Sequence, residues 1–233
     1  MIAWKWKMIK AVVFDLDDTL FPEMQFVEQG FEYVAQIVGE KYHLQGVYPR
    51  LLQLFEQDHA NVYNRLLDSF GIKYCESDIA ELAQEYRSCE RTNLQFYPDT
   101  IGVLEELRKH NIRIGVITDG RIECQKNKIS SLEVEKYVDF VVITDSLGGE
   151  KFRKPHPKAF EIMREKLQVE FNEMIYVGDN RAKDFAIGAL YPIVTCEISR
   201  ADKLYRNKEY CNGILPKITI KTLSELLEYI RKM

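Results

Sequence analysis

Two acidic residues separated by one position, Asp15 and Asp17, are the side chains of this 233-residue sequence best suited to chemistry. They lie in the segment Phe14-Asp15-Leu16-Asp17-Asp18-Thr19-Leu20, after a short β-branched run that predicts a buried strand. We expect that strand to run from Ala11 to Asp15. Because side chains alternate along a strand, Asp15 and Asp17 can both project from its carboxyl end only where the backbone begins to turn. One carboxylate can attack phosphorus and form an acyl phosphate, while the other protonates the leaving oxygen and later takes a proton from water. The pair therefore predicts a phosphoryl-transfer site with Asp15 and Asp17 as its catalytic residues.

Two further polar segments are suited to binding a phosphoryl group. Thr118 closes the apolar run Ile114-Gly115-Val116-Ile117 and is followed by Asp119 and Gly120. A hydroxyl there can donate to a phosphoryl oxygen, and the glycine lets backbone N–H groups approach the same anion. Lys154, which precedes a predicted helix, supplies a fixed cation. We therefore expect Thr118, Asp119, Gly120 and Lys154 to bind phosphate.

A metal site is expected from two more acids, Asp179 and Asp184, which follow a later predicted strand. Acids that converge on one point repel one another and require a hard cation, and Mg²⁺ suits because it prefers oxygen ligands and keeps several waters. The expected ligands are Asp15, the main-chain carbonyl of Asp17, and Asp179. Asp184 is expected to orient a metal-bound water or Lys154.

The elements that carry these residues divide into two kinds. From about Pro22 to about Phe96 the pattern is helical, with Val27, Phe31, Val34, Ala35 and Val38 on one helix face and Ser77 as a possible N-cap of a later helix. From Tyr97 onward helices and strands alternate, which predicts parallel strands joined by crossovers. The expected strands are Ile112–Thr118, Phe140–Thr144, Met174–Val177, Ile193–Cys196 and Ile218–Ile220. A helix is also expected to start near Arg181. We predict an α/β core domain from residues 1–20 and 97–233, and a helical domain from 21–96.

Composition excludes several other classes of protein. The sequence has a net charge of −4 and no long cluster of Lys and Arg, which argues against nucleic acid as a partner. No apolar run approaches the roughly 18 residues of a membrane span, so no membrane partner is expected. Five cysteines without a CxxC pair fit neither a disulfide framework nor a zinc site and favour the cytoplasm. The opening Met1–Lys7 lacks the features of a signal peptide.

Taken together, the polar segments resemble the four ordered motifs of the haloacid dehalogenase superfamily. The matching positions are Asp15-x-Asp17-x-Thr19, Thr118, Lys154, and Gly178-Asp179 with Asp184. The resemblance implies a Rossmann-like core with a parallel central sheet and an inserted all-helical cap domain. It also implies Asp15 as nucleophile, Asp17 as general acid and base, phosphate contacts from Thr118 and Lys154, and Mg²⁺ held by Asp15, Asp17 and Asp179. One departure is Asp119, where close relatives often have Asn.

Within that superfamily the sequence is most similar to phosphatases of small metabolites. We therefore expect a Mg²⁺-dependent phosphatase that hydrolyses a sugar phosphate or nucleotide monophosphate through an aspartyl-phosphate intermediate. A phosphomutase would keep all four motifs and remains an alternative. A dehalogenase has no use for an acid at position 17, and a catalytically idle binding module would be expected to lack a carboxylate that this chain retains. The substrate and the oligomeric state stay open.

Overall fold

The computed structural model describes residues 9–204 and 208–232. The opening segment, for which the sequence predicts no signal peptide, lies outside these residues. The chain separates into two compact units, which we call the core unit (Met1–Glu23 with Asn93–Met233) and the helical unit (Met24–Thr92). The domain boundaries expected from the sequence, at 20/21 and 96/97, stay a prediction.

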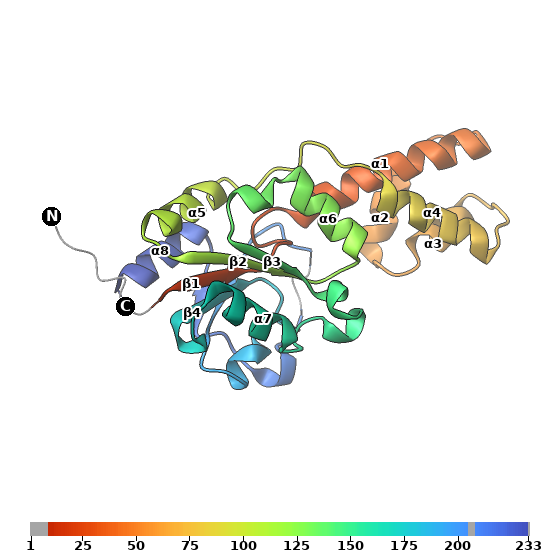
Figure 1. Cartoon of the computed structure of the whole chain (residues 1–233). Coiled ribbons are helices and arrows are strands. Elements are labelled where there is room, and N and C mark those ends of the chain that lie inside the picture. The colour runs from red at the N-terminus through yellow and green to blue at the C-terminus, as the bar shows by residue number, and fades with distance from the viewer. Residues whose placement is uncertain (1–8, 205–207, 233) are drawn as a thin grey trace. The chain divides into compact units, whose positions relative to one another are not determined.

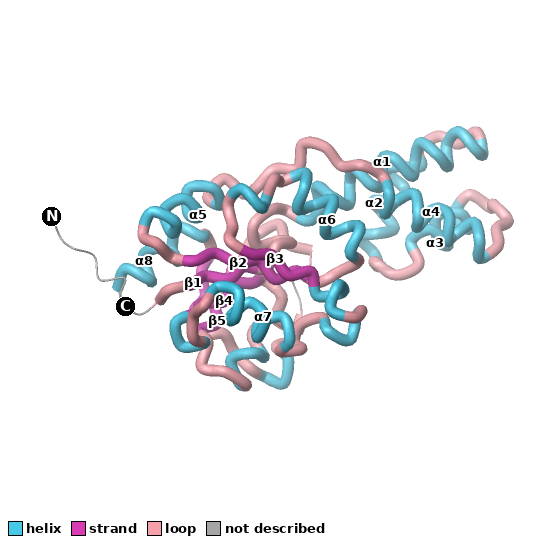
Figure 2. Tube along the Cα trace, viewed as in Figure 1, coloured by secondary structure: helices cyan, strands magenta, loops and turns pink. Residues whose placement is uncertain are grey.

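The core unit is built around one sheet of six strands in the order β3-β2-β1-β4-β5-β6 (Figures 1 and 2). The strands are β1 Ala11–Phe14, β2 Arg113–Thr118, β3 Phe140–Ile143, β4 Met174–Gly178, β5 Val194–Ile198 and β6 Ile218–Ile220. Every neighbouring pair is parallel. The predicted α/β class with a parallel central sheet is confirmed.

Helices cover both faces of this sheet. Those of the core unit are α5 Thr100–Lys109, α6 Ile122–Ser131, α7 Lys158–Leu167 and α8 Leu223–Lys232. Helices α5, α6 and α8 lie on one face and α7 lies on the other (Figure 1). Each turns an apolar stripe inward, as Val103, Leu104 and Leu107 of α5 show. Because both faces are covered, β1 and β4 are buried along their whole length.

The strand order brings three polar segments to one point. From β1 the chain crosses to β2 and β3 on one side, and β4 then returns to pair with the other side of β1. The carboxyl end of β1 is therefore a topological switch point, where open α/β sheets bind ligands. Asp15 follows β1, Thr118 ends β2 and Asp179 follows β4.

Two expectations about local structure were wrong. No helix begins near Arg181, where the chain instead makes turns before a short 3-10 helix at Ala186–Ala189. The turn forms because Asp184 accepts the backbone N–H of Asn180 (2.8 Å), a local bond that competes with helix hydrogen bonds. Ser77 is not an N-cap either, since its helix starts one residue earlier with Cys75 as the cap residue and Asp78 accepting the Cys75 N–H (2.9 Å).

The helical unit contains most of α1 Glu23–Tyr42, together with α2 Val47–Gln57, α3 Val62–Ser69 and α4 Glu76–Ser88. The predicted stripe of α1 is buried. Phe31 packs edge-to-face on Phe55 and lies beside Tyr86. The Arg91 guanidinium lies over the rings of Phe26 and Tyr86, 3.9 and 4.6 Å from their centroids. Across the described residues of both units, none of the helices is long and apolar enough to cross a membrane.

Candidate active site

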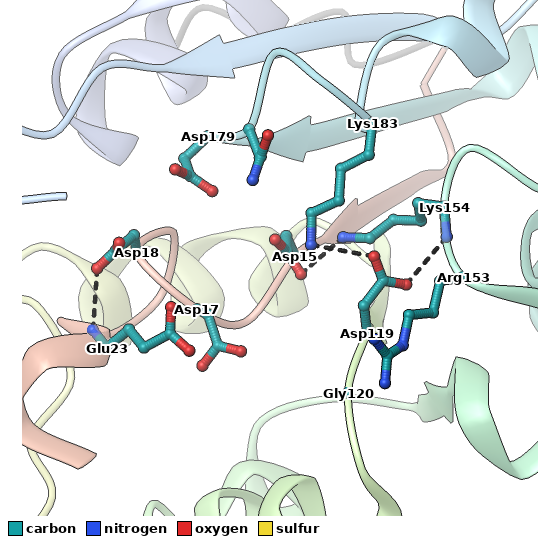
Figure 3. Close-up of a pocket in the computed structure, with 11 residues that line it drawn as sticks. Asp15, Asp17, Asp18, Glu23, Asp119, Gly120, Arg153, Lys154, Asp179 and Lys183 are labelled. Carbon is teal, nitrogen blue, oxygen red and sulfur yellow. Dashed lines mark hydrogen bonds and ion pairs between the residues drawn. The ribbon is translucent and has the colours of Figure 1, made fainter. Parts of the chain in front are cut away.

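A cavity of about 320 Å³ opens at the carboxyl ends of the strands in the core unit (Figure 3). It is lined by Asp15, Asp17, Asp18, Glu23, Asp119, Gly120, Arg153, Lys154, Asp179, Asn180 and Lys183. Six of the residues predicted for the site are in this lining. The other two, Thr118 and Asp184, are fully buried beside it. The structure thus brings all the predicted site residues together.

The predicted nucleophile is held by an ion pair. The Asp15 backbone N–H donates to the carbonyl of Val177 in β4 (2.8 Å), which fixes the position of the residue after β1. Its carboxylate Oδ1 lies 2.8 Å from Lys154 Nζ, and both side chains are almost fully buried. Burial raises the pKa of Asp15 to about 6, against the opposing charge of Lys154 and with a further rise from Asp184. This arrangement presents an anionic oxygen at the cavity wall.

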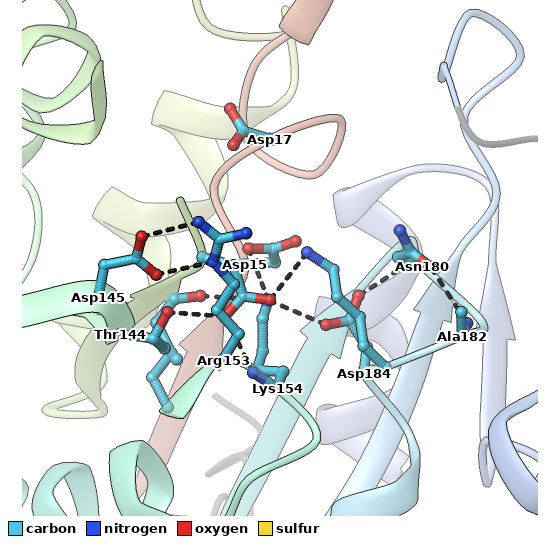
Figure 4. Close-up of polar contacts among 12 residues, drawn as sticks. Asp15, Asp17, Thr144, Asp145, Arg153, Lys154, Asn180, Ala182 and Asp184 are labelled. Carbon is cyan, nitrogen blue, oxygen red and sulfur yellow. Dashed lines mark hydrogen bonds and ion pairs between the residues drawn. The ribbon is translucent and has the colours of Figure 1, made fainter. Parts of the chain in front are cut away.

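Lys154 itself is fixed by several acceptors (Figure 4). Its Nζ lies 2.9 Å from Asp184 Oδ1 and donates to the hydroxyl of Tyr176 (2.8 Å). Tyr176 donates to the same Asp184 oxygen (3.1 Å). A side chain at Gly178 would place its Cβ 2.5 Å from Asp184 Oδ2, so glycine is required there for the carboxylate to lie against the end of β4. Asp184 therefore contacts Lys154 directly, and its expected role in orienting that lysine stays a prediction.

The predicted general acid is held by helix α6. Lys128 Nζ lies 2.6 Å from Asp17 Oδ1, and Gln125 Nε2 donates to Asp17 Oδ2 (3.0 Å). Lys128 also pairs with Glu23 at 3.2 Å. Burial raises the pKa of Asp17, while the charge of Lys128 opposes that rise. Both oxygens of the carboxylate are thereby oriented toward donors on one helix face.

The phosphate side of the cavity contains an unpartnered hydroxyl. Thr118 Oγ1 is buried, and the described residues offer it no hydrogen-bond partner. Next to it, Asp119 accepts from the Lys154 backbone N–H (3.0 Å) and the Thr144 hydroxyl (2.9 Å). Gly120 has φ +135°, and a Cβ there would lie 2.7 Å from Gln125 Nε2. A buried hydroxyl left without an acceptor suits a phosphoryl oxygen as its partner.

Asp119 also pairs with a lysine that the sequence reasoning did not select. Lys183 Nζ lies 3.0 Å from Asp119 Oδ2 (Figure 3). Burial alone would raise the pKa of Asp119, but the charges of Lys154 and Lys183 and their hydrogen bonds hold it below its usual range. Asp119 is therefore a carboxylate in the folded protein.

The acids of the site fit a divalent cation. Asp15, Asp179 and Asp184 each place a carboxylate oxygen within 4.8 Å of the others, and all three are buried. Asp179 Oδ2 is buried and has no hydrogen-bond partner among the residues described. Burial, followed by the charges of Asp184 and Asp15, raises the pKa of Asp179 well above its usual value. Both oxygens of Asp184 are already engaged, so Asp15 and Asp179 have the oxygens better placed for a metal.

Asp18 is a further residue that sequence reasoning missed. It adopts φ +51° and accepts the backbone N–H groups of Glu23 (2.9 Å) and Leu204 (2.7 Å). Burial raises its pKa to about 7. Its carboxylate thus connects the loop after β1 to the start of α1 and to the backbone at Leu204. No sequence pattern predicts these contacts.

Lys128 and Gln125 were missed for a similar reason. Their spacing of three residues on a predicted helix was visible in the sequence, but a lysine three residues from a glutamine is common on exposed helix faces. Lys183 directly precedes Asp184, and no sequence pattern predicts that it reaches Asp119.

The chain is similar to known proteins over most of its length. Residues 12–190 match the family of haloacid dehalogenase-like hydrolases. Over 97% of its length the chain is 28% identical to 99% of a glyceraldehyde 3-phosphate phosphatase of Methanopyrus kandleri. It is 26% identical to the human N-acylneuraminate-9-phosphatase over 77% of this chain and 78% of that one. Among solved structures, a haloacid dehalogenase phosphatase from Thermococcus onnurineus matches with a TM-score of 0.61 and 26% identity, over 95% of this chain and 98% of that one.

The chain belongs to the haloacid dehalogenase-like hydrolases. The family predicted from the four motifs is confirmed, and so is its phosphatase branch, since the relatives above are phosphatases. The chain is accordingly an enzyme of the phosphoric monoester hydrolase class.

Proposed function

We propose that this enzyme is a Mg²⁺-dependent phosphatase of a small phosphorylated metabolite, acting through an aspartyl-phosphate intermediate. The observation that carries the proposal is the convergence of Asp15, Lys154 and Asp179 on one cavity, beside the unpartnered hydroxyl of Thr118. A nucleophile, a cation, a metal ligand and a phosphoryl donor are the parts that phosphoryl transfer requires.

In the first step a carboxylate oxygen of Asp15 attacks phosphorus in line with the leaving oxygen. The new O–P bond forms as the ester O–P bond breaks, and Asp17 gives its proton to the departing alkoxide. Lys128 and Gln125 hold Asp17 during this transfer. Thr118 and the backbone around Gly120 donate to the phosphoryl oxygens.

In the second step water attacks the aspartyl phosphate. Asp17 takes a proton from that water, phosphate leaves, and the Asp15 carboxylate is restored. Lys154 keeps Asp15 in the same orientation through both steps because its contacts with Tyr176 and Asp184 do not involve the substrate.

The acid cluster is where Mg²⁺ would be held, with Asp15, Asp179 and the main-chain carbonyl of Asp17 as ligands. The bound ion supplies charge neutralisation to the phosphoryl oxygens. The buried Asp179 oxygen without a partner supports this assignment.

The relatives suggest the class of substrate. One of them is a glyceraldehyde 3-phosphate phosphatase and another is an N-acylneuraminate-9-phosphatase, so we propose a phosphorylated sugar or a three-carbon phosphate in preference to a nucleotide. The helical unit is proposed to act as the cap that selects among such substrates. A phosphomutase stays the alternative, and the chain is proposed to work in the cytoplasm.

The experiment is an assay of phosphate release from a panel of phosphorylated sugars, three-carbon phosphates and nucleotides, with and without Mg²⁺. We expect release that requires Mg²⁺ and that is abolished in Asp15→Asn, which keeps the shape of the side chain but removes the nucleophile. Circular dichroism checks that the variant is folded. Turnover by folded Asp15→Asn would refute the nucleophile assignment, and isomerised sugar phosphate without free phosphate would identify a mutase.

A further inference from the structure

A lysine outside the four motifs contacts the loop that carries a proposed metal ligand. Lys203 follows β5 in the sequence, and only 5% of its side chain is exposed. Its Nζ donates to the main-chain carbonyl of Asp179 at 2.8 Å. Lys203 is not among the described residues that line the catalytic cavity. It therefore acts on the site through the backbone of Asp179.

The peptide group between Asp179 and Asn180 is held on both sides. Lys203 donates to its carbonyl oxygen, and Asp184 Oδ2 accepts its N–H at 2.8 Å. A peptide group is planar, so bonds to its oxygen and to its N–H fix the orientation of the whole plane. Because this plane begins at the Cα of Asp179, the two bonds restrict the direction in which the Asp179 carboxylate projects.

Lys203 is itself anchored by a buried carboxylate. Glu197 of β5 is fully buried, and its Oε1 lies 3.8 Å from Lys203 Nζ. Arg181 Nε and the Tyr210 hydroxyl donate to the two oxygens of Glu197, at 2.8 and 2.6 Å. A buried polar group that is satisfied by several partners makes its surroundings rigid. Glu197 thus connects Lys203 and Arg181, a residue of the loop after β4, to a central strand of the core unit.

The segment that carries Lys203 also contacts the loop after β1. The Leu204 backbone N–H donates to Asp18 Oδ2 at 2.7 Å. One guanidinium nitrogen of Arg200 donates to the main-chain carbonyl of Thr19 at 3.2 Å. The loop after β1 supplies the other proposed ligands of the ion. The segment therefore connects the two loops whose ligands must converge on one cation.

We propose that Lys203 is a positioning residue of the metal centre, which increases the Mg²⁺ affinity by holding the main chain of Asp179 in place relative to the loop after β1. The inference rests on the proposed Mg²⁺-dependent phosphatase function and adds to it a residue outside the four motifs. Loss of a residue that orients a metal ligand lowers metal affinity by about 10- to 100-fold.

The sign of the effect separates this role from an effect of charge alone. The ammonium group carries a positive charge close to the ion, so by charge alone its removal strengthens Mg²⁺ binding. Its removal also leaves the Glu197 carboxylate less compensated, which again favours a cation. If Lys203 positions Asp179, its removal instead weakens Mg²⁺ binding, because the carboxylate of Asp179 loses its fixed direction.

The test measures Mg²⁺ binding to Lys203→Met, which keeps most of the length of the side chain and removes its donors. Calorimetric titration of the metal-free protein with Mg²⁺ gives the Kd without any substrate, and the rise of the thermal unfolding midpoint with Mg²⁺ checks it. We expect the Kd to rise by about 10- to 100-fold. Lys203→Gln, also uncharged, covers the case in which Lys203→Met does not fold. The control Lys217→Met, at an exposed position just before β6, should leave the Kd unchanged.

A purely structural role predicts a different result. Lys203→Met would then lower the unfolding midpoint in EDTA and leave the Kd for Mg²⁺ unchanged or lower, which would overturn the inference. Failure of the unmodified protein to bind Mg²⁺ would overturn it as well. The proposed function fails in a separate way, because a protein that binds Mg²⁺ but releases phosphate from no ester would refute it. The Mg²⁺ titration would still decide the role of Lys203 in that case.

Discussion

At the scale of single residues, the site is defined by the balance of its buried charges. When all are ionised, Asp15, Asp119, Asp179 and Asp184 carry four negative charges, and Lys154 and Lys183 carry two positive ones, which leaves an excess of two negative charges in this set. Buried charges are tolerated when they are paired and hydrogen-bonded. The Asp119 and Asp184 carboxylates are paired in this way, whereas Asp179 has an oxygen with no partner in the described structure. A divalent cation supplies the charge that this set lacks.

The prediction at this scale concerns Asp119→Asn. The variant keeps an acceptor for Thr144 and the Lys154 backbone N–H but leaves the charges of Lys154 and Lys183 less compensated. Because the pKa of Asp119 is lowered in the folded protein, its ionised form stabilises the fold above the unfolded value near 3.8. We expect Asn to lower the free energy of unfolding by about 1–3 kcal/mol at pH 7.

The lowered pKa of Asp119 also predicts how the difference in the free energy of unfolding between the two proteins changes with pH. As pH falls below 3.8 and through the lower folded pKa, the stabilisation by the carboxylate is lost, so the two proteins should converge in acid. Urea unfolding from pH 7 down to the lowest pH at which both proteins fold measures it. A gap between the two that widens toward low pH would contradict the assignment of Asp119 as a stabilising carboxylate.

At the scale of elements, helix α6 contacts the side chain of Asp17, the proposed general acid. Gln125 and Lys128 are three residues apart on one face, and both are almost fully buried. They contact the two oxygens of Asp17, and Gln125 also donates to the Asp119 carbonyl (2.7 Å). One helix therefore connects the loop after β1 with the loop after β2.

We predict that Lys128→Met impairs proton donation by Asp17. Esters with a poor leaving group need a well-placed acid, while aryl phosphates such as p-nitrophenyl phosphate need it much less. A misplaced catalytic group costs about 100-fold. We expect kcat/KM to fall by about that factor for alkyl phosphates and much less for the aryl ester.

The ratio between the two substrates is the decisive measurement, because loss of folded enzyme lowers both rates equally. Lys126→Met, an exposed lysine of the same helix, is the matched control and should leave the ratio unchanged. Asp17→Asn should show the same selective loss as Lys128→Met. If Asp17→Asn shows it and Lys128→Met does not, α6 does not position the acid.

The elements themselves were largely predictable from the sequence, and their mutual contacts were not. Each expected strand was found within two residues of its predicted bounds. The face of α6 that carries Lys128 meets Asp17 because β2 lies next to β1. Strand order is set by packing across the whole sheet, so one sequence without structural context does not specify it. The turn at Asn180 was missed because a side-chain bond from Asp184 replaced the expected helix.

At the scale of the whole molecule, the chemistry and the proposed selectivity belong to different units. Every residue lining the catalytic cavity belongs to the core unit. The helical unit has its own packed interior around Phe31 and Tyr86. We therefore expect substitutions inside the helical unit to change which esters are accepted, while the reaction of a generic aryl phosphate depends on the core.

The last prediction is that the metal site sets the stability of the whole molecule. Clustered buried acids oppose folding until a cation neutralises them, and a ligand bound only to the folded state stabilises it by about 2.7 kcal/mol at 100 times its Kd. For a protein of this size that corresponds to a rise of about 5–10 °C in Tm. Asp179→Asn removes one of the acids, so it should unfold at or above the Tm of the unmodified protein in EDTA and show no rise with Mg²⁺. The exposed Asp68→Asn serves as control and should keep the full rise. If Mg²⁺ still raises the Tm of Asp179→Asn, the ion binds elsewhere. If, in EDTA, the variant has a lower Tm than the unmodified protein, Asp179 stabilises the fold without a metal.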